Sequence, residues 1–150
     1  MIRQNIVFVE NKAGSLRKVT ALLAEKQIRI YGFACFDAPE YALFRMICND
    51  PDQAEQVLSE NGYMNRITPV IVVSMKDEVD GLDEILDVMA ESNVNLNYIY
   101  TSFHRSTGVP VAVMYAAEDM FVTESILKGN GFRVLDSMDE LKEQEAYEAR

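Results

Sequence analysis

The sequence predicts an α+β fold built from two consecutive βαββαβ units, with an antiparallel sheet and helices on one of its faces. Three observations lead to this prediction. The chain repeats its own apolar pattern, each copy alternates strand-like and helix-like segments in the same order, and no flexible linker separates the copies. The predicted units are residues 1–68 and 69–136, followed by a tail or short helix at 137–150.

The internal repeat is visible residue by residue. Leu16–Glu25 and the Ile28–Ile30 that follows match Leu82–Glu91 and Val94–Leu96 at an offset of 66 residues. Later in each unit the offset is 69, and the matching pairs are Asp50 and Asp119, Val57 and Ile126, Leu58 and Leu127, and Gly62 and Gly131. The second copy therefore carries three extra residues near its middle.

The first copy gives the clearest secondary-structure signals. Leu16, Val19 and Leu23 recur at helical spacing, and Pro51 stands where a first helical turn accepts proline. The expected elements are a strand at Asn5–Val9, a helix at Leu16–Glu25, strands at Ile28–Phe36 and Tyr41–Cys48, a helix from Pro51 to a stop at Asn61-Gly62, and an extended stretch at Tyr63–Met75.

The second copy repeats the same order of elements. Its expected strands are Val70–Met75, Val94–His104, Val109–Ala117 and Phe132–Leu135, and its expected helices are Gly81–Ser92 and Asp119–Gly129. Pro69 marks the passage between the units, because proline cannot donate to a central ladder. The order is that of the ferredoxin-like, split-βαβ fold. We expect the two units to lie side by side, with their sheets merged and the helices on one face.

Composition excludes several classes of partner. Of the 150 residues, 24 are Asp or Glu and 14 are Lys or Arg, which gives a formal charge of −10. An acidic surface repels phosphates, so we expect neither nucleic acid nor an anionic membrane as a partner. There is no signal peptide and no apolar run of eighteen residues, which predicts a cytoplasmic protein. Cys35 and Cys48 are expected to be buried free thiols, with a bridge between neighbouring strands as the alternative.

No catalytic motif is recognisable. His104 is the only histidine and is expected to be exposed at a hairpin tip, so neither a multi-histidine metal site nor a Ser-His pair is supported. The sequence contains no P-loop, Cys-x-x-Cys pair, His-Glu-x-x-His motif or nucleophile elbow. We therefore predict a protein without enzymatic activity, metal or cofactor.

The loop that joins the first strand to the first helix has the features of a ligand site. Gly14 lacks a Cβ that would keep a ligand from the backbone, and Ser15 is able to cap the helix. A helix N-terminus attracts a carboxylate, while the Asn11 side chain offers an acceptor for an ammonium group. Together these groups complement the two ends of a zwitterion. The alternative is an ordinary strand-to-helix turn.

The run Val7–Leu16, followed by Leu23–Glu25 and Ile28–Ile30, resembles an ACT domain. The likeness extends over about residues 3–136, and the chain looks most like small stand-alone proteins made of two ACT units. The resemblance implies a regulatory protein that binds an amino acid or similar small molecule at the interface between units. The first loop, with the facing second strand of the other unit as the floor, gives the expected ligand-binding residues Asn11, Lys12, Ala13, Gly14, Ser15, Leu16, Tyr100, Thr101 and Ser102.

Two departures from the family pattern qualify this expectation. The family favours proline before the glycine, where this chain has Ala13. In the second copy Asp80 replaces the glycine; its carboxylate is expected to cap the helix and to repel an incoming carboxylate. The second loop is therefore the weaker expected site, with residues Asp77, Val79, Asp80, Gly81 and Leu82.

Two other functions compete with a stand-alone amino-acid sensor. One is a regulatory subunit of an amino-acid biosynthetic enzyme, resembling the small subunit of acetohydroxyacid synthase, although those chains carry a different second domain. The other is a structural pairing module with an empty loop. The expected partner is a small molecule, accompanied by a second copy of the chain or by a partner enzyme.

Overall fold

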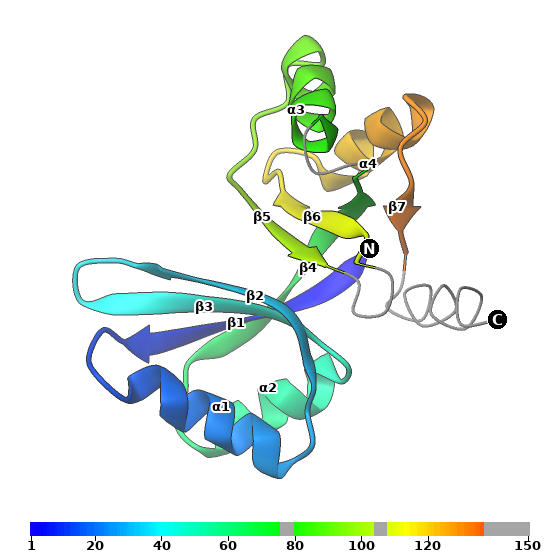
Figure 1. Ribbon diagram of the computed structural model, residues 1–150. Helices are drawn as coiled ribbons and strands as arrows, with labels where there is room; N and C mark the ends of the chain where they lie inside the picture. Colours follow the sequence, from blue (N-terminus) through cyan, green and yellow to red (C-terminus); the bar gives the residue numbers. More distant parts are fainter. Residues whose placement is uncertain (76–79, 104–107, 137–150) are drawn as a thin grey trace, which may run out of the picture. The chain divides into compact units, whose positions relative to one another are not determined.

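The computed structural model describes residues 1–75, 80–103 and 108–136. Helices and strands alternate in the predicted order (Figure 1). In chain order the elements are β1 Ile2–Glu10, α1 Ser15–Glu25, β2 Ile30–Asp37, β3 Tyr41–Cys48, α2 Pro51–Glu60, β4 Asn65–Ser74, α3 Gly81–Glu91, β5 Tyr98–Phe103, β6 Pro110–Tyr115, α4 Met120–Gly129 and β7 Val134–Leu135.

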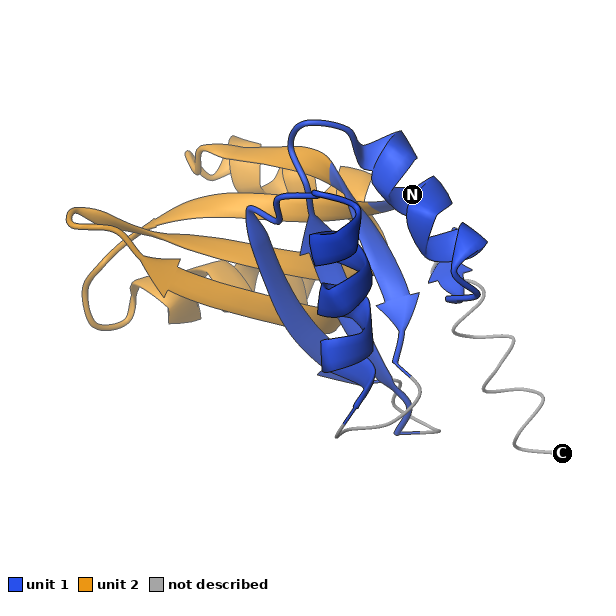
Figure 2. Ribbon diagram, turned by 90° about the horizontal axis from the view of Figure 1, so that it is seen from above, with its two compact units in different colours: residues 1–2, 69–150 blue, residues 3–68 orange. Residues whose placement is uncertain are grey.

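The chain divides into two compact units (Figure 2). The N-terminal unit, drawn in orange, is Arg3–Thr68; the C-terminal unit, drawn in blue, is Met1–Ile2 together with the chain from Pro69 onward. Strand β4 runs through the boundary and contributes its first residues to one unit and its later residues to the other. The expected side-by-side arrangement with a merged sheet remains a prediction.

The N-terminal unit has the strand order β2-β3-β1-β4, and β3 is antiparallel to both β2 and β1. Apolar residues alternate along its strands, so that one face of the sheet meets both helices, α1 and α2 (Figure 1). The core on this face comprises Val7, Val9, Val19, Leu23, Ile28, Phe44, Met46, Cys48, Ala54 and Leu58. The predicted ferredoxin-like unit is confirmed here.

The C-terminal unit repeats this arrangement. Strand β6 lies between β5 and β4, and β7 pairs with β4, with every pair antiparallel. Helices α3 and α4 supply Ile85, Met89 and Leu127 to its core. These side chains are the repeat partners of Val19, Leu23 and Leu58, so the duplicated apolar positions fill equivalent places in both cores.

Four expected strands begin at least two residues later than predicted: β2 at Ile30, β4 at Asn65, β5 at Tyr98 and β7 at Val134. The cause is the way the preceding helices end. In α1, Ile28 N–H donates to Leu23 O (3.0 Å), and in α3, Val94 N–H donates to Met89 O (2.9 Å). Both are the closing bond of a Schellman motif, in which an apolar residue after the helix packs back on the core. Ile28 and Val94 therefore terminate helices instead of starting strands.

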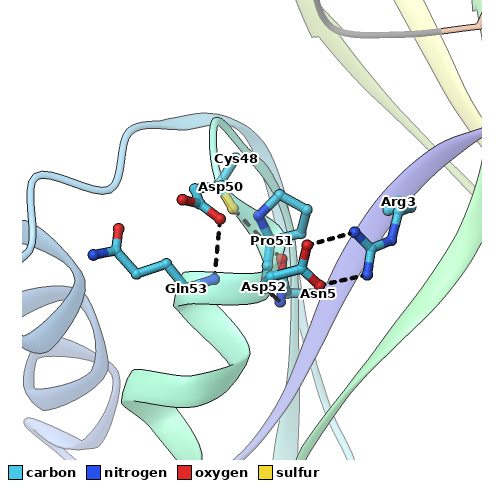
Figure 3. A network of polar contacts seen from close by, with 7 residues as sticks. All are labelled: Arg3, Asn5, Cys48, Asp50, Pro51, Asp52 and Gln53. Atoms are coloured by element: carbon cyan, nitrogen blue, oxygen red, sulfur yellow. Dashed lines mark hydrogen bonds and ion pairs between the residues drawn. The ribbon is translucent and has the colours of Figure 1, made fainter.

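The start of α2 is fastened to the N-terminal sheet (Figure 3). Asp50 caps the helix by accepting a hydrogen bond from Gln53 N–H (3.0 Å), as its place before Pro51 predicts. Asn5, which is fully buried on β1, donates from Nδ2 to Pro51 O (2.9 Å) and accepts from Cys48 Sγ (3.4 Å). A buried amide thus satisfies both of its polar groups.

The two cysteines differ in exposure. Cys48 is buried, and burial raises the pKa of its thiol to about 11. Cys35 is exposed, so the expectation that both thiols are buried is wrong for this residue, which lies on the outer strand β2. Both thiols are free, and the alternative of a bridge between them is therefore wrong.

Candidate functional site

The loop after β1 turns tightly into α1. Lys12 N–H donates to Glu10 O (3.0 Å), and Ser15 N–H donates to Lys12 O (3.2 Å). Gly14 has a φ of +83°, a left-handed conformation in which a side chain is strained. A Cβ built on Gly14 meets nothing within 4 Å. Glycine is therefore required here by backbone conformation, and the space beside it is open.

The N-terminus of α1 is not capped by a side chain. Gly14 occupies the N-cap position, and Ser15 is already the first helical residue. The expectation that Ser15 caps the helix is wrong, because a capping residue has non-helical backbone angles. The Ser15 side chain is buried (8% exposed), and its hydroxyl has no hydrogen-bond partner among the described residues.

Two of the other described helices, α2 and α4, have a side-chain cap at their N-terminus. Asp50 caps α2, and Asp119 caps α4 by accepting from Val122 N–H (2.9 Å). Leu16 and Arg17, in the first turn of α1, have amide N–H groups that find no backbone acceptor in the described part of the chain. These amides and the Ser15 hydroxyl leave the positive end of α1 free to receive an anion.

A cleft of ≈ 280 Å³ lies beside this helix end. It is enclosed entirely by the N-terminal unit: the end of β1, the loop, the first turn of α1 and the turn between α2 and β4. The lining residues are Phe8, Val9, Glu10, Lys12, Ser15, Lys18, Gly62, Tyr63 and Met64. Polar and charged side chains form a large part of this lining, beside the apolar Phe8, Val9, Tyr63 and Met64.

The charges around the cleft leave it locally positive. Lys12 Nζ lies 2.7 Å from Glu10 Oε2, and their hydrogen bond lowers the pKa of Glu10 and raises that of Lys12. The pair is therefore ionised and self-neutralising. Lys18, one turn into α1, forms no ion pair with the residues that the structure describes. Its ammonium group adds to the positive helix end, although the whole chain is strongly acidic.

The structure brings only part of the expected first site together. Lys12 and Ser15 line the cleft, whereas Asn11, Ala13 and Gly14 lie exposed in the loop and do not line it. Leu16 packs against the core of the N-terminal unit. Sequence reasoning missed Glu10, Lys18, Tyr63 and Met64 as lining residues. The strand order of the predicted fold could have indicated Tyr63 and Met64: β4 lies next to β1, so the turn before β4 borders the first loop.

The remaining expected residues belong to the C-terminal unit. On β5, Tyr100 is buried, and Thr101 Oγ1 donates to Val111 O (3.3 Å) within its own sheet; Ser102 is half-buried. Their approach to the first loop remains a prediction.

At the second loop, Asp77 and Val79 lie outside the described residues. Asp80 is the N-cap of α3 but makes no side-chain capping bond, so the expectation that it caps the helix is wrong. Its backbone is already helical (φ −95°, ψ −19°), whereas a side chain that caps a helix belongs to a residue with non-helical backbone angles. Gly81 is buried, Leu82 is exposed, and Asp83 and Glu84 add negative charge to the first turn. This helix start is a poor place for an anion.

Other kinds of site find no support in the part of the chain that is described. Within residues 1–75, 80–103 and 108–136, no three His, Cys, Asp or Glu side chains gather as metal ligands would. No helix in these ranges is long and apolar enough to span a membrane. His104 lies outside them.

Comparison with known families decides what the repeat represents. The family model of the ACT domain pair matches residues 1–138. The chain belongs to the ACT domain pair family. Among curated proteins, no sequence matches it significantly.

Solved structures agree with this assignment. Protein BT0572 from Bacteroides thetaiotaomicron is 26% identical, with a TM-score of 0.81 over 89% of this chain and 91% of its own. The ligand-free regulatory subunit of aspartate kinase from Thermus thermophilus is 19% identical, with a TM-score of 0.59 over 85% of this chain and 90% of its own. The regulatory subunit of aspartate kinase from Thermus flavus is 20% identical, with a TM-score of 0.56 over 86% and 92%. At these identities the two aspartate kinase subunits show the shared fold of the ACT pair.

Proposed function

We propose that this ACT domain pair is a small regulatory protein, without catalysis of its own, that binds an amino acid or similar small molecule in the cleft beside α1. The observation that carries the proposal is the start of α1: Ser15, whose buried hydroxyl has no partner among the described residues, lines a cleft of ≈ 280 Å³. A ligand carboxylate placed there would accept hydrogen bonds from groups that have no partner in the described part of the chain.

The ammonium end of an amino acid also needs an acceptor. Glu10 lines the cleft with a carboxylate whose pKa the hydrogen bond from Lys12 lowers, and an ammonium group would compete with Lys12 for it. Asn11 and the strand Tyr100–Ser102 are further predicted ammonium partners. Substituting Asn11→Ala and Glu10→Ala separately distinguishes the two side chains, because only the one that holds the ammonium group weakens binding when its oxygen is lost; if neither weakens binding, the backbone carbonyls of Tyr100–Ser102 remain the predicted acceptors.

The likeness to regulatory subunits supports a regulatory role and also favours a second candidate. In this candidate the pair is the regulatory subunit of a biosynthetic enzyme and works only when bound to that enzyme. The two candidates differ in what the isolated chain does. A sensor responds to its ligand by changing its own stability or assembly, whereas a subunit needs a second, different chain for any regulatory effect.

A thermal-shift experiment with each of the twenty amino acids tests the proposal. A ligand at one hundred times its dissociation constant stabilises the folded state by about 2.7 kcal/mol. The expected result is stabilisation by one amino acid or a small related group. Stabilisation by none would leave the loop empty, as in a purely structural pairing module, and would contradict the proposal.

Variants then locate the site. Ser15→Ala removes a hydroxyl that has no partner in the described structure, so the free protein keeps its stability while ligand affinity falls. Gly14→Val places a branched side chain in the open space of the loop and should weaken binding at least tenfold, about 1.4 kcal/mol. Because valine is strained at the φ of Gly14, Ser15→Ala is the cleaner variant. Asp80→Val, at the corresponding position of the second loop, is the matched control and should matter less.

A further inference from the structure

Lys18 brings a second positive group to the cleft beside α1, in addition to the N-terminus of the helix. It lies three residues after Ser15, and residues at this spacing are neighbours on one face of a helix. Both residues line the cleft. Long side chains of a helix lean back toward its N-terminus, over the preceding turn. The Lys18 ammonium group and the first turn of α1 therefore act on the same part of the cleft.

The charges that line the cleft do not cancel. Its charged side chains are one carboxylate, Glu10, and two ammonium groups, Lys12 and Lys18. Glu10 and Lys12 pair with each other at 2.7 Å, whereas Lys18 forms no ion pair within the described ranges. One positive charge is therefore left over at the cleft, and the partial positive charge of the helix start adds to it.

Two further observations connect this charge with a ligand. The pKa of Glu10 is lowered chiefly by the hydrogen bond from Lys12 and in smaller part by the charge of Lys18, so that charge acts inside the cleft. Ser15 is only 8% exposed, and its hydroxyl has no partner in the part of the chain that the structure describes. A buried hydroxyl of this kind calls for an acceptor from outside the chain.

We propose that the ligand of this cleft is an acidic amino acid, aspartate or glutamate, whose side-chain carboxylate pairs with Lys18. The inference rests on the proposed function and names the class of its ligand. The α-carboxylate takes the start of α1 with the Ser15 hydroxyl, and the ammonium group competes with Lys12 for Glu10. A neutral amino acid leaves the extra positive charge of the cleft unbalanced, whereas an acidic one carries a net negative charge that balances it.

The second copy of the repeat has the opposite charge at the matching position. The offset of 66 residues places Glu84 where the first copy has Lys18, and Asp83 where it has Arg17. The first turn of α3 is therefore acidic where that of α1 is basic. An acidic ligand is repelled there, so the preference belongs to the first loop alone.

Isothermal titration calorimetry of the full chain with L-glutamate, L-aspartate, L-glutamine and L-asparagine tests the proposal. Each acid is compared with its own amide, which has nearly the same shape without the charge. At least one acid should bind about fivefold more tightly than its amide, which is the upper range for an exposed ion pair. Added salt should narrow this difference, because salt screens exposed charges.

Variants of α1 assign the preference to Lys18. Lys18→Gln should bring the acid and its amide to equal affinity while the affinity for the amide stays unchanged. The matched control is Arg17→Gln, which removes the same charge from a neighbouring exposed residue that does not line the cleft, and it should keep the preference. An amide that binds as well as its acid, or a preference that survives Lys18→Gln, would overturn the proposal. Binding of neutral or basic amino acids alone would overturn it and leave the proposed function standing, whereas binding of no amino acid would overturn both.

Discussion

Among single residues, the buried Asn5 is expected to be costly to remove because of its hydrogen bonds. It is fully buried, and its amide bonds both Pro51 O and the Cys48 thiol (Figure 3). Asn5→Ala leaves these groups without their partner, and we expect the free energy of unfolding to fall by about 1–3 kcal/mol. Urea denaturation measures the loss.

The control for this prediction lies at the same helix end. Arg3 forms an ion pair with Asp52 (2.7 Å), but both side chains are largely exposed to water. Exposed ion pairs contribute little, because solvent screens their charges. Arg3→Ala should therefore cost clearly less than Asn5→Ala. Equal losses would contradict the view that burial decides the importance of the contacts at the start of α2.

The site residues could be predicted from the sequence only in part. The first loop could be recognised from Gly14 and its neighbours, and the lining residues Lys12 and Ser15 were among those predicted. The exact start of α1 could not be predicted from the sequence, because Gly14 and Ser15 are both acceptable N-cap residues. Only the left-handed backbone of Gly14 decides between them. Lys18 and Tyr63 reach the cleft through packing between segments far apart in the chain, which periodicity does not report.

Among the elements, the C-terminal ends of helices α1 to α4 have the same hydrogen-bonding pattern. Each closes with a Schellman motif, and the left-handed residue is Gly62 in α2 and Gly131 in α4, but Gln27 in α1 and Asn93 in α3. Glutamine is the least suited of these to a positive φ, here +55°. The end of α1 is therefore strained at Gln27, whereas the end of α2 avoids this strain by having Gly62 at the same place.

Replacing this residue is expected to stabilise the protein. Gln27→Gly relieves a left-handed conformation that costs non-glycine residues roughly 1–2 kcal/mol, offset in part by the greater freedom of glycine in the unfolded chain. We expect a net gain of up to about 1 kcal/mol in the free energy of unfolding. Lys26→Gly, one residue earlier with a φ of −93°, is the control and should be destabilising. If Gln27→Gly lowered the free energy of unfolding, the left-handed backbone of Gln27 would not be a source of strain.

Element boundaries illustrate the same limit of prediction. Every helix and strand was expected in its observed order, because apolar periodicity is set by burial on one face. The starts of β2 and β5 were placed too early, since Ile28 and Val94 are as apolar as strand residues. They serve as the apolar residue that follows a helix end, a role that depends on hydrogen bonds to the preceding turn.

For the whole molecule, we predict that the two units unfold together. Strand β4 contributes to both, and no linker lies between them. Leu58 and Leu127 are repeat partners, each fully buried in the core of its unit, so Leu58→Ala and Leu127→Ala form a matched pair. Each should lower the midpoint of one shared unfolding transition, at a cost of about 2–5 kcal/mol.

Calorimetry of both leucine variants checks this prediction. If one variant split the transition and left the other unit unfolding at its original temperature, the units would be independent domains. Limited proteolysis near Pro69 addresses the same point, because release of two separately folded halves would contradict joint unfolding of the units.

The central claim is that a small amino acid binds at the open N-terminus of α1. Two-dimensional ¹H–¹⁵N NMR spectra of the full chain, recorded with each of the twenty amino acids in turn, test it most directly. The account predicts that a binding amino acid shifts the amide signals of Ser15, Leu16 and Arg17 most strongly, and shifts those of Leu82 and Asp83 at the start of α3 less. Shifts confined to α3 or to residues away from both loops, or no shift with any amino acid, would contradict it.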